Sequence, residues 1–440
     1  MRDLIVFGVV FGLLPFCFLR PWVGVLVFCW LSYMNPHRFT WGPAYAFPFA
    51  QIVAMATLAG FMLTREKDRF YMEREFVLVI LLWVVFTLTS FSAFYPENAW
   101  EMWKKTSKIF LIALITVPLF IDRVKLKWLL LITALSLGML GVKGGIFTIL
   151  SGGAHNVKGP PGSFMTGEGD FGLALNMTVP ILYYLARSEE NLKLKFVLNS
   201  ALVFSVISII FTYRRGAFLG LAAVGLLLLL KSRRKILAVP LIALGVLAAP
   251  FLVTEKWTER MGTIGSYEED GSAMGRINAW KTAWNVVQAR PLQGAGFEGL
   301  SGETIYRYSP DPAATAGDVH SIYFEVLGEH GFVGFALFAA LLLSALLSLR
   351  KLKKDSRGDP ARKWIVDYSD MLQVSIIAYM VCGIFLGRAY FDLFYNVIMI
   401  VVILKVLARK EMAKASAPSP GALPALEAAP ARAGAAQKAV

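Results

Sequence analysis

Long apolar runs recur along nearly the whole chain and are separated by short polar connections. Many of these runs approach the roughly 20 apolar residues that a helix needs to cross a bilayer. Because the runs are continuous rather than alternating, the pattern excludes a transmembrane β-barrel. The predicted fold class is therefore all-α, a polytopic transmembrane helical bundle of about 12 spans, near residues 3–34, 45–63, 76–93, 108–122, 126–150, 171–187, 195–213, 215–230, 236–253, 321–348, 370–387 and 389–408.

The first apolar run, 3–34, is interrupted at Arg20-Pro21. The pattern leaves two arrangements open, one broken span or a short hairpin. The run has no small-residue cleavage site, so we expect a retained span rather than a removed signal peptide. Hydrophobic residues make up 57% of the chain and charged residues only 17%, well below the roughly 25% charge typical of soluble domains.

Basic residues concentrate in five of the short connections, 64–69, 122–127, 187–195, 231–235 and 350–357. The order of the spans allows all five to lie on one side, which the positive-inside rule makes cytoplasmic. This distribution accounts for the net charge of +14 better than nucleic-acid binding does. The alternate connections then face outward, and the longest of them, 254–319, is polar enough to stand outside the membrane. We expect it to contain helices.

Four regions follow from this topology. We predict an N-terminal transmembrane bundle (1–253), a periplasmic loop with helices (254–319), C-terminal transmembrane helices (320–410) and a disordered cytoplasmic tail (411–440). The three cysteines lie in apolar runs and the four histidines are dispersed. Neither set has the spacing of a metal site or a disulfide framework, so we expect no metal and no cofactor.

Several basic residues lie at the outer side, against the positive-inside bias. Arg214 and Arg215 occupy a short outward turn, where they either bind an anion, extend to the interface or pair with an acid of the 254–319 loop. Lys143 lies near the outer end of a span beside Gly144 and Gly145, which allow close approach of a backbone or ligand. Arg388 precedes Asp392 in the last outward turn, so an ion pair between them and a ligand role are equal alternatives.

The long polar loop adds two further candidates. From Arg276 onward, apolar residues recur at helical spacing, and we place Arg276 in the first turn of that helix, where the N-terminus also favours anions. His320 opens the next apolar run, HSIYFEVLGEHG. A histidine at this boundary can act as a general base or merely cap the helix. Glu325 and Glu329 follow on the same run and require partners, and we assign them no role.

Three segments together carry a resemblance to a known family. The stretches RRGAFLGL, GRINAWKTAW…PLQGAGFE and HSIYFEVLGEHGFVGF resemble the O-antigen ligase/polymerase superfamily, most of all O-antigen ligases of the WaaL type. The chain is also similar to putative O-glycosylation ligases associated with exosortases, at GVKGGIFTILSGG and LALNM, although GEGDFG departs from the acidic-amide segment typical of that group.

The resemblance implies a multi-pass enzyme of the bacterial inner membrane with its active site facing the periplasm. It implies transfer of a glycan from undecaprenyl diphosphate, the donor carrier, to lipid A–core oligosaccharide, the acceptor. Carried over by position, His320 is the general base, and Arg215 and Arg276 bind the diphosphate. Arg214, Lys143 and Arg388 are further donor-binding candidates. Arginines can neutralise the charge that grows on the leaving diphosphate, so we expect metal-independent, inverting transfer.

Other functions remain open at this point. An O-antigen polymerase or a protein O-glycosylation ligase would use the same donor chemistry with another acceptor. A transporter is the default for about 12 spans, but the spans show no visible internal repeat, and transporters rarely need one large outward loop.

Overall fold

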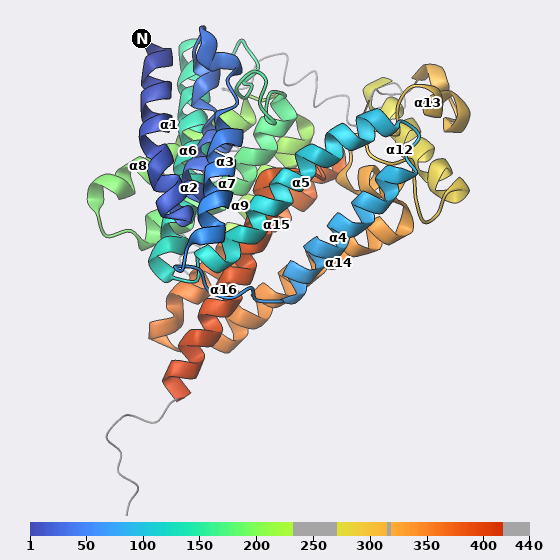
Figure 1. The fold of residues 1–440 in the computed structure, drawn as a ribbon. Coiled ribbons are helices and arrows are strands. Elements are labelled where there is room, and N and C mark those ends of the chain that lie inside the picture. The colour runs from blue at the N-terminus through green and yellow to red at the C-terminus, as the bar shows by residue number, and fades with distance from the viewer. Residues whose placement is uncertain (232–270, 315–317, 417–440) are drawn as a thin grey trace, which may run out of the picture.

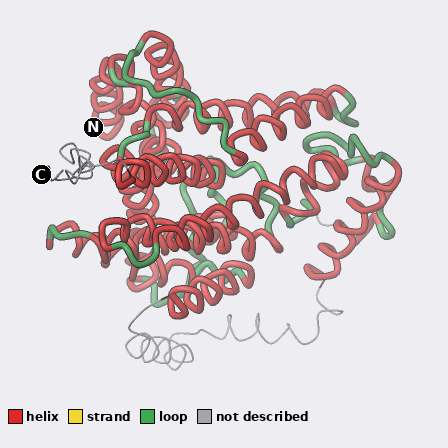
Figure 2. The backbone as a smooth tube through the Cα atoms, turned by 90° about the horizontal axis from the view of Figure 1, so that it is seen from below, coloured by secondary structure: helices red, strands yellow, loops and turns green. Residues whose placement is uncertain are grey.

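We describe the chain from a computed structural model, which covers residues 1–231, 271–314 and 318–416. Within these ranges the chain forms helices and connections, and no strand (Figures 1 and 2). Before residue 232 the α-helices are α1 (Arg2–Leu19), α2 (Pro21–Met34), α3 (Phe49–Leu63), α4 (Arg74–Phe91), α5 (Pro96–Leu119), α6 (Arg123–Leu150), α7 (Glu168–Ser188), α8 (Leu192–Ile210) and α9 (Arg215–Lys231). After residue 270 they are α12 (Gly271–Ala289), α13 (Glu303–Tyr308), α14 (Ile322–Ser356), α15 (Lys363–Cys382) and α16 (Asp392–Ser416).

The helices coincide with the predicted apolar runs because burial and backbone hydrogen bonding both demand helices there. Six helical stretches are long and apolar enough to cross a membrane: Arg2–Leu19, Arg74–Phe91, Arg123–Leu150, Leu192–Ile210, Ile322–Ser356 and Pro360–Phe385. Helices α2 and α3 are apolar but shorter. The predicted span 236–253 lies outside the described residues, and the total of about 12 spans stays a prediction.

The first apolar run forms a hairpin of two helices rather than one broken span. Arg20 departs from helical geometry (φ −129°, ψ 83°), and Pro21 begins α2, where its missing N–H costs nothing. The start of α1 then lies beside the connection after α2, because the Ala44 amide donates to Asp3 Oδ1 at 3.1 Å. Figure 1 shows α1 and α2 side by side. Of the two arrangements that the sequence left open, the structure has the hairpin.

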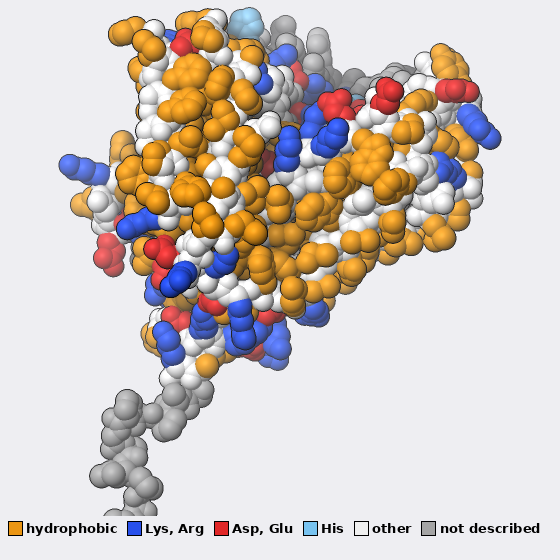
Figure 3. Space-filling model, in the orientation of Figure 1, with side chains coloured by type: hydrophobic (Ala, Val, Ile, Leu, Met, Phe, Trp, Pro, Cys, Tyr) orange, Lys and Arg blue, Asp and Glu red, His pale blue; other side chains and the backbone are white. Residues whose placement is uncertain are grey.

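Four of the five basic connections lie at one end of the bundle, and the fifth, 231–235, lies almost wholly outside the described residues. Lys410 binds Asp68 at 2.6 Å, and Lys127 binds Glu189 at 2.9 Å, so connections far apart in sequence are tied together. Lys, Arg, Asp and Glu side chains gather at the lower end of the view in Figure 3, below a largely hydrophobic surface. We call this the inner end. The shared location of these connections supports the predicted parity of the spans.

A fully buried carboxylate strengthens the inner end. Glu75 of α4 accepts hydrogen bonds from Ser344 and Ser348 of α14 at 2.8 and 2.6 Å. Lys405 of α16 lies 2.5 Å from the other oxygen of Glu75 and 3.1 Å from Glu73. Three helices are thereby joined around one charge, which is stable only because all its bonding groups have partners.

At the end of the bundle opposite the inner end, small residues allow neighbouring helices to pack closely. A Cβ at Gly141 would lie 2.2 Å from Ser205 Oγ, and one at Gly145 would lie 2.8 Å from the Phe204 carbonyl, so α6 and α8 are in close contact. The glycines beside Lys143 therefore admit a neighbouring helix. Between α7 and α9, a Cβ at Gly172 would approach that of Ala217 to 2.6 Å, and Asn176 of α7 donates to the Ala217 carbonyl at 2.9 Å.

The predicted span 321–348 is not one uninterrupted helix. Gly331 has φ 66° and ψ −170°, which breaks α14 into two segments. The turn Gly294–Gly296 covers this break: the amides of Ala295 and Gly296 donate to the carbonyls of Gly328 and Glu329, each at 2.8 Å. Glycine is required at 331 because this backbone conformation excludes most side chains and because Pro291 and Leu292 lie against it.

Candidate functional site

Four polar segments meet at the end opposite the basic connections, which we call the outer end. They are the start of α7, the 211–214 turn before α9, the segment 318–321 before α14, and the 386–391 turn between α15 and α16. Arg214 donates to Glu168 Oε2 at 2.7 Å, and a Cβ at Gly387 would lie 2.7 Å from Asp318 Oδ1. Arg388 of the last turn donates to Asp170 of α7, which lies 218 residues away, so the four segments form one polar surface.

Glu168 orients the first of the arginines. Its carboxylate is largely buried, accepts the Arg214 hydrogen bond and also lies 3.3 Å from Lys158 Nζ. Burial alone would raise the pKa of Glu168, but the hydrogen bond and charge of Arg214 lower it to about 2. Glu168 is thus ionised at neutral pH. Arg214 therefore has an acidic partner in the 151–170 stretch, while the acids at 255–270, which the sequence offered as alternative partners, lie outside the described residues.

Asp170, two residues further along α7, holds Arg388. The Arg388 Nε and Nη2 atoms donate to the two carboxylate oxygens at 2.8 and 2.7 Å, the bidentate geometry that fixes a guanidinium most firmly. Burial lowers the pKa of Arg388, and the bonds to Asp170 outweigh that effect, so its net pKa shift is upward. The alternative that Arg388 pairs with Asp392 is wrong, since Asp392 accepts from Ser32 at 2.9 Å.

His320 lies between these arginines and the long loop. Its backbone is left-handed (φ 50°), a strained conformation for a residue other than glycine, of the kind that clusters at functional sites. Asp318 Oδ1 accepts the His320 amide at 3.3 Å, and Oδ2 lies 3.4 Å from His320 Nδ1. This contact favours the tautomer with its proton on Nδ1, leaving Nε2 as a proton acceptor. The side chain is 35% exposed, so solutes can reach it.

The surroundings keep His320 neutral. Burial is the main cause of a lowered pKa at His320; Asp318 and Asp170 oppose the shift, while Arg276 and Arg214 add to it. A neutral imidazole is the form that accepts a proton. Arg276, Arg214 and Asp170 are thus close enough to His320 for their charges to affect its pKa. The structure therefore brings together one histidine, several arginines and three carboxylates.

Arg276 belongs to this group, but its predicted position within the helix is wrong. Helix α12 begins at Gly271, so Arg276 lies in the second turn, away from the backbone amides of the N-terminus. Residues 271–275 (GSAMG) extend the helix toward its N-terminus, and they have no apolar periodicity that would reveal it. Trp280 fixes α12 here: its Nε1 donates to the Val319 carbonyl at 3.0 Å, and its ring stacks on Phe324 of α14 with 5.2 Å between centroids.

Residues 200–339 match a family model described as O-antigen ligase. The chain belongs to the O-antigen ligase/polymerase superfamily. Residues 1–189 match a second model, described as a family of unknown function, and no curated protein matches the chain. It is therefore a membrane enzyme of the ligase/polymerase type. The O-antigen ligase match contains Arg215, Arg276 and His320, the positions that the resemblance selected, and also Arg214.

Arg215 is the first residue of α9 and follows Arg214 directly. It is half-buried. A Cβ at the adjacent Gly216 would lie 3.4 Å from Cβ of Phe385, so the start of α9 lies against the connection that leads to Arg388. Arg215 at the start of α9 therefore lies near the turn that contains Arg388.

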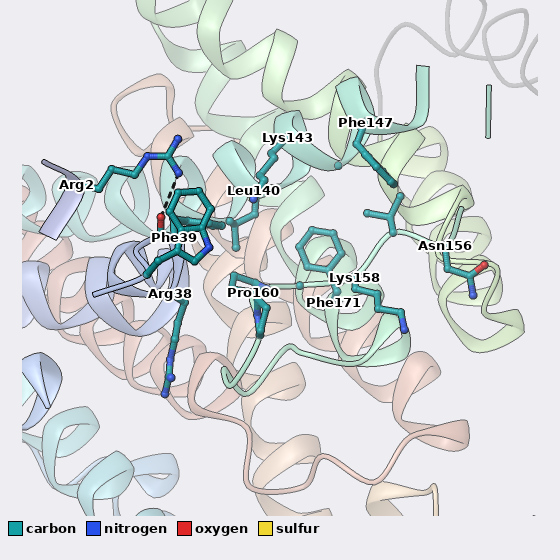
Figure 4. Close-up of a pocket in the computed structure, with 15 residues that line it drawn as sticks. Arg2, Arg38, Phe39, Leu140, Lys143, Phe147, Asn156, Lys158, Pro160 and Phe171 are labelled. Atoms are coloured by element: carbon teal, nitrogen blue, oxygen red, sulfur yellow. Dashed lines mark hydrogen bonds between the residues drawn. The ribbon is translucent and has the colours of Figure 1, made fainter. Parts of the chain in front are cut away.

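Lys143 is the donor-binding candidate that the structure places elsewhere. It projects from α6 into a separate cavity of about 470 Å³, and its ammonium lies 3.9 Å from the ring centroid of Phe39. Figure 4 shows Lys143 among Phe39, Leu140 and Phe171. The helical position of Lys143 near an outer end was correct, but its inclusion in the donor-binding group with Arg214 and Arg276 has no support from any contact.

Glu325 and Glu329 have the partners that their burial requires. Glu325 accepts the Ala389 amide at 2.8 Å. Glu329 accepts the Tyr390 hydroxyl at 2.5 Å and the Glu298 amide at 2.8 Å. Both carboxylates bind the first segment of α14 to neighbouring turns, and Glu325 holds the residue directly after Arg388. Their contacts are those of positioning residues.

Sequence reasoning missed the roles of Glu168, Asp170 and Asp318. The first two were visible as the acidic residues of GEGDFG at the start of an apolar run, where acids are favoured by the helix N-terminus. Their arginine partners lie 46 and 218 residues away, and no local pattern specifies such pairs. Within the described ranges, no group of three or more His, Cys, Asp or Glu residues is arranged to hold a metal ion.

Proposed function

We propose that the protein is a membrane glycosyltransferase that transfers a glycan from undecaprenyl diphosphate to an acceptor hydroxyl at the periplasmic face. The observation that carries this proposal is the convergence of His320, paired with Asp318, with arginines 214, 276 and 388 at one end of the bundle. Membership of the ligase/polymerase superfamily supports it.

The arginines would bind the diphosphate of the donor. Arg214 uses Nη2 for Glu168, and Arg388 uses Nε and Nη2 for Asp170, so each guanidinium keeps further N–H groups for oxygen ligands. Oriented in advance by carboxylates, these donors need little reorganisation as negative charge develops on the leaving group. Arg215 and Arg276 would complete the diphosphate-binding group. Arginine suits this role better than lysine, because its guanidinium can bind a phosphate through two hydrogen bonds.

His320 would act as the general base. The acceptor hydroxyl attacks the anomeric carbon, its proton passes to His320 Nε2, and the bond from that carbon to the diphosphate oxygen breaks. The undecaprenyl diphosphate leaves with the electron pair, and attack from the opposite face inverts the anomeric configuration. Asp318 would hold the imidazole and stabilise its charge once protonated, as carboxylates paired with histidine do. We expect this step to proceed without a metal.

We place the site at the periplasmic face of the inner membrane, because the positively charged connections lie at the opposite end of the bundle. The proposed acceptor is lipid A–core oligosaccharide. A polymerase or a protein O-glycosylation ligase would use the same site chemistry with a growing glycan or a protein as acceptor. A transporter remains the least supported alternative, given the superfamily match.

Reconstituted protein supplied with purified carrier-linked glycan tests the proposal. The acceptors compared are lipid A–core, a second carrier-linked glycan and an unfolded protein, each with and without chelator. We expect transfer to lipid A–core that chelator leaves unchanged. Transfer only to the second glycan would assign the polymerase reaction, and transfer only to protein the O-glycosylation reaction. Absence of transfer to all three acceptors would contradict the proposed enzyme function.

A further inference from the structure

The cavity that contains Lys143 is built by elements distant in sequence. Arg2 begins α1, Arg38 lies in the 3-10 turn η1 (Pro36–Phe39), Lys143 belongs to α6, and Lys158 follows in the 151–167 connection. The volume is about 470 Å³, within the range of roughly 300–1,000 Å³ typical of small-molecule sites. In Figure 4, Arg2 and Arg38 lie on one side of Phe171, and Asn156 and Lys158 lie on the other.

The lining of this cavity is strongly positive. Four of its described lining residues are cations, Arg2, Arg38, Lys143 and Lys158, and none of the described lining residues is acidic. The Arg2 Nη1 atom donates only to the Phe39 carbonyl, at a long 3.4 Å. The Nε atom of Arg38 is buried and has no hydrogen-bond partner in the described part of the chain. A buried donor without a partner costs free energy, which an anionic ligand would recover.

Aromatic rings complete the cavity wall. Phe39, Trp41, Phe147 and Phe171 contribute to it, and the Trp41 side chain is 86% exposed. Lys143 and Arg38 already lie over the rings of Phe39 and Tyr45, at 3.9 and 4.8 Å. Aromatic faces beside fixed cations suit a ligand that carries both an apolar ring face and a negative charge. A sugar bearing a phosphate or carboxylate has this combination.

The cavity also adjoins the proposed transfer site. Lys158 and Asn156 line it and both contact Glu168, at 3.3 and 3.4 Å. Glu168 in turn holds Arg214 at 2.7 Å. A ligand in the cavity would therefore lie beside the arginine cluster, separated from it by one carboxylate.

We propose that this cavity is the acceptor subsite and binds an anionic sugar of the acceptor through its phosphate or carboxylate. The inference rests on the proposed glycan transfer and deepens it, since the arginine cluster would bind the donor and this cavity the acceptor. Lys143 is then a specificity-determining residue for the acceptor instead of a donor-binding one. The outer end holds two anion sites with different ligands.

Binding without turnover tests the subsite directly. The purified full chain in phosphatidylcholine nanodiscs is titrated with glucose 6-phosphate and with glucose. We expect glucose 6-phosphate to bind and glucose to bind at least about tenfold more weakly. We expect Lys143→Gln to lower the affinity for glucose 6-phosphate about tenfold, because one charge-assisted contact is lost. Lys143→Arg should retain most of the affinity, which separates loss of charge from misfolding.

Lys125→Gln is the matched control, because Lys125 lies on the same helix at the inner end and also packs over an aromatic ring, that of Trp22. Equal affinity of glucose 6-phosphate for wild type and Lys143→Gln, or no binding to wild type, would overturn the proposal. Lys143-dependent retention of phosphatidylglycerol without glucose 6-phosphate binding would assign the cavity to a lipid headgroup and also overturn it. Because this assay needs no transfer, its result is independent of the proposed reaction.

Transfer kinetics provide a second readout. Relative to wild type, we expect Lys143→Gln to raise the KM for the acceptor about tenfold and to leave the KM for the carrier-linked donor unchanged. A rise in the donor KM alone would return Lys143 to the donor site and contradict the acceptor subsite.

Discussion

The two ends of the bundle use the same residue types in different ways. At the inner end, Lys405 and Glu75 are 11% and 0% exposed and are surrounded by Glu73, Ser344 and Ser348. At the outer end, Arg214 and Arg388 are 46% and 40% exposed, and each has one carboxylate partner that a described contact identifies. Charges whose bonding capacity is used up inside the protein hold helices together. Charges that are oriented but still accessible can bind a ligand.

This contrast predicts that mutations at the outer end impair activity and that mutations at the inner end impair stability. Substitutions at the two ends test this difference.

Removal of Arg276 or Arg215 should cause the largest loss of activity. Each alanine variant removes charge that stabilises the departing diphosphate, and the loss of one such donor costs about 10²–10³-fold in rate. Lysine at either position should restore activity only in part, because it lacks the bidentate fork. The measurement is kcat/KM for the carrier-linked donor, with thermal unfolding recorded alongside. Wild-type donor kinetics in both alanine variants would remove these residues from the site.

Glu75→Gln should mainly affect stability. The substitution leaves the largely buried Lys405 with Glu73 alone and disturbs the bonds of Ser344 and Ser348. Breaking a buried ion pair typically costs about 3–5 kcal/mol. The check is the midpoint of denaturation in detergent, where we expect a clear decrease, while kcat per folded molecule is preserved. A variant as stable as wild type but inactive would reverse the assigned roles of the two ends.

Arg388→Lys and Arg409→Lys together compare a bidentate contact with an exposed ion pair. Lysine cannot reproduce the two bonds to Asp170, so we expect about a tenfold lower kcat/KM for the donor. Arg409→Lys is the matched control at the inner end, where Arg409 makes an exposed ion pair with Glu73. Such pairs contribute about 0–1 kcal/mol, and this variant should behave like wild type. Equal effects of the two substitutions would contradict a special role for Arg388.

The pH dependence of transfer should show the smallest change. Because burial depresses the pKa of His320 below 6.5, its neutral form predominates at pH 7, and the rate should decrease only as pH falls through the lowered pKa. Asp318 raises this pKa, so Asp318→Asn should move the acidic limb to lower pH while also reducing the maximal rate. An unchanged limb, or a shift to higher pH, would exclude the Asp318–His320 pair as the titrating unit.

The sequence predicted the helices well because apolar runs in a membrane have few alternatives to helix. It also located the turn at Arg214, the outward helix around Trp280 and the position of His320 before an apolar helix. The break at Gly331 escaped prediction, since a single glycine in an apolar run does not reveal that Pro291 and Leu292 pack against it. The start of α12 was misplaced because residues 271–275 have no apolar periodicity.

The candidate site was predicted less completely than the fold. Residue type and position identified His320 and the arginines, but their partners depend on tertiary contacts. The pairing of Arg388 with Asp170 joins α7 to the last outward turn across 218 residues, and a nearer acid, Asp392, provided the more obvious choice. Lys143 shows the reverse error: its position near an outer end was correct, yet its side chain enters a different cavity.

In the proposed reaction the outer arginines bind the carrier diphosphate, and His320 removes the acceptor proton. A single-turnover experiment separates the two steps, using radiolabelled carrier-linked glycan, excess acceptor and chelator in proteoliposomes of wild type, His320→Ala and His155→Ala. His155 is an exposed histidine of an outer connection and serves as the control. We expect His320→Ala to bind donor normally and transfer at least about 10²-fold more slowly, with His155→Ala unchanged. Transfer at the wild-type rate in His320→Ala would contradict the role of His320 as the general base.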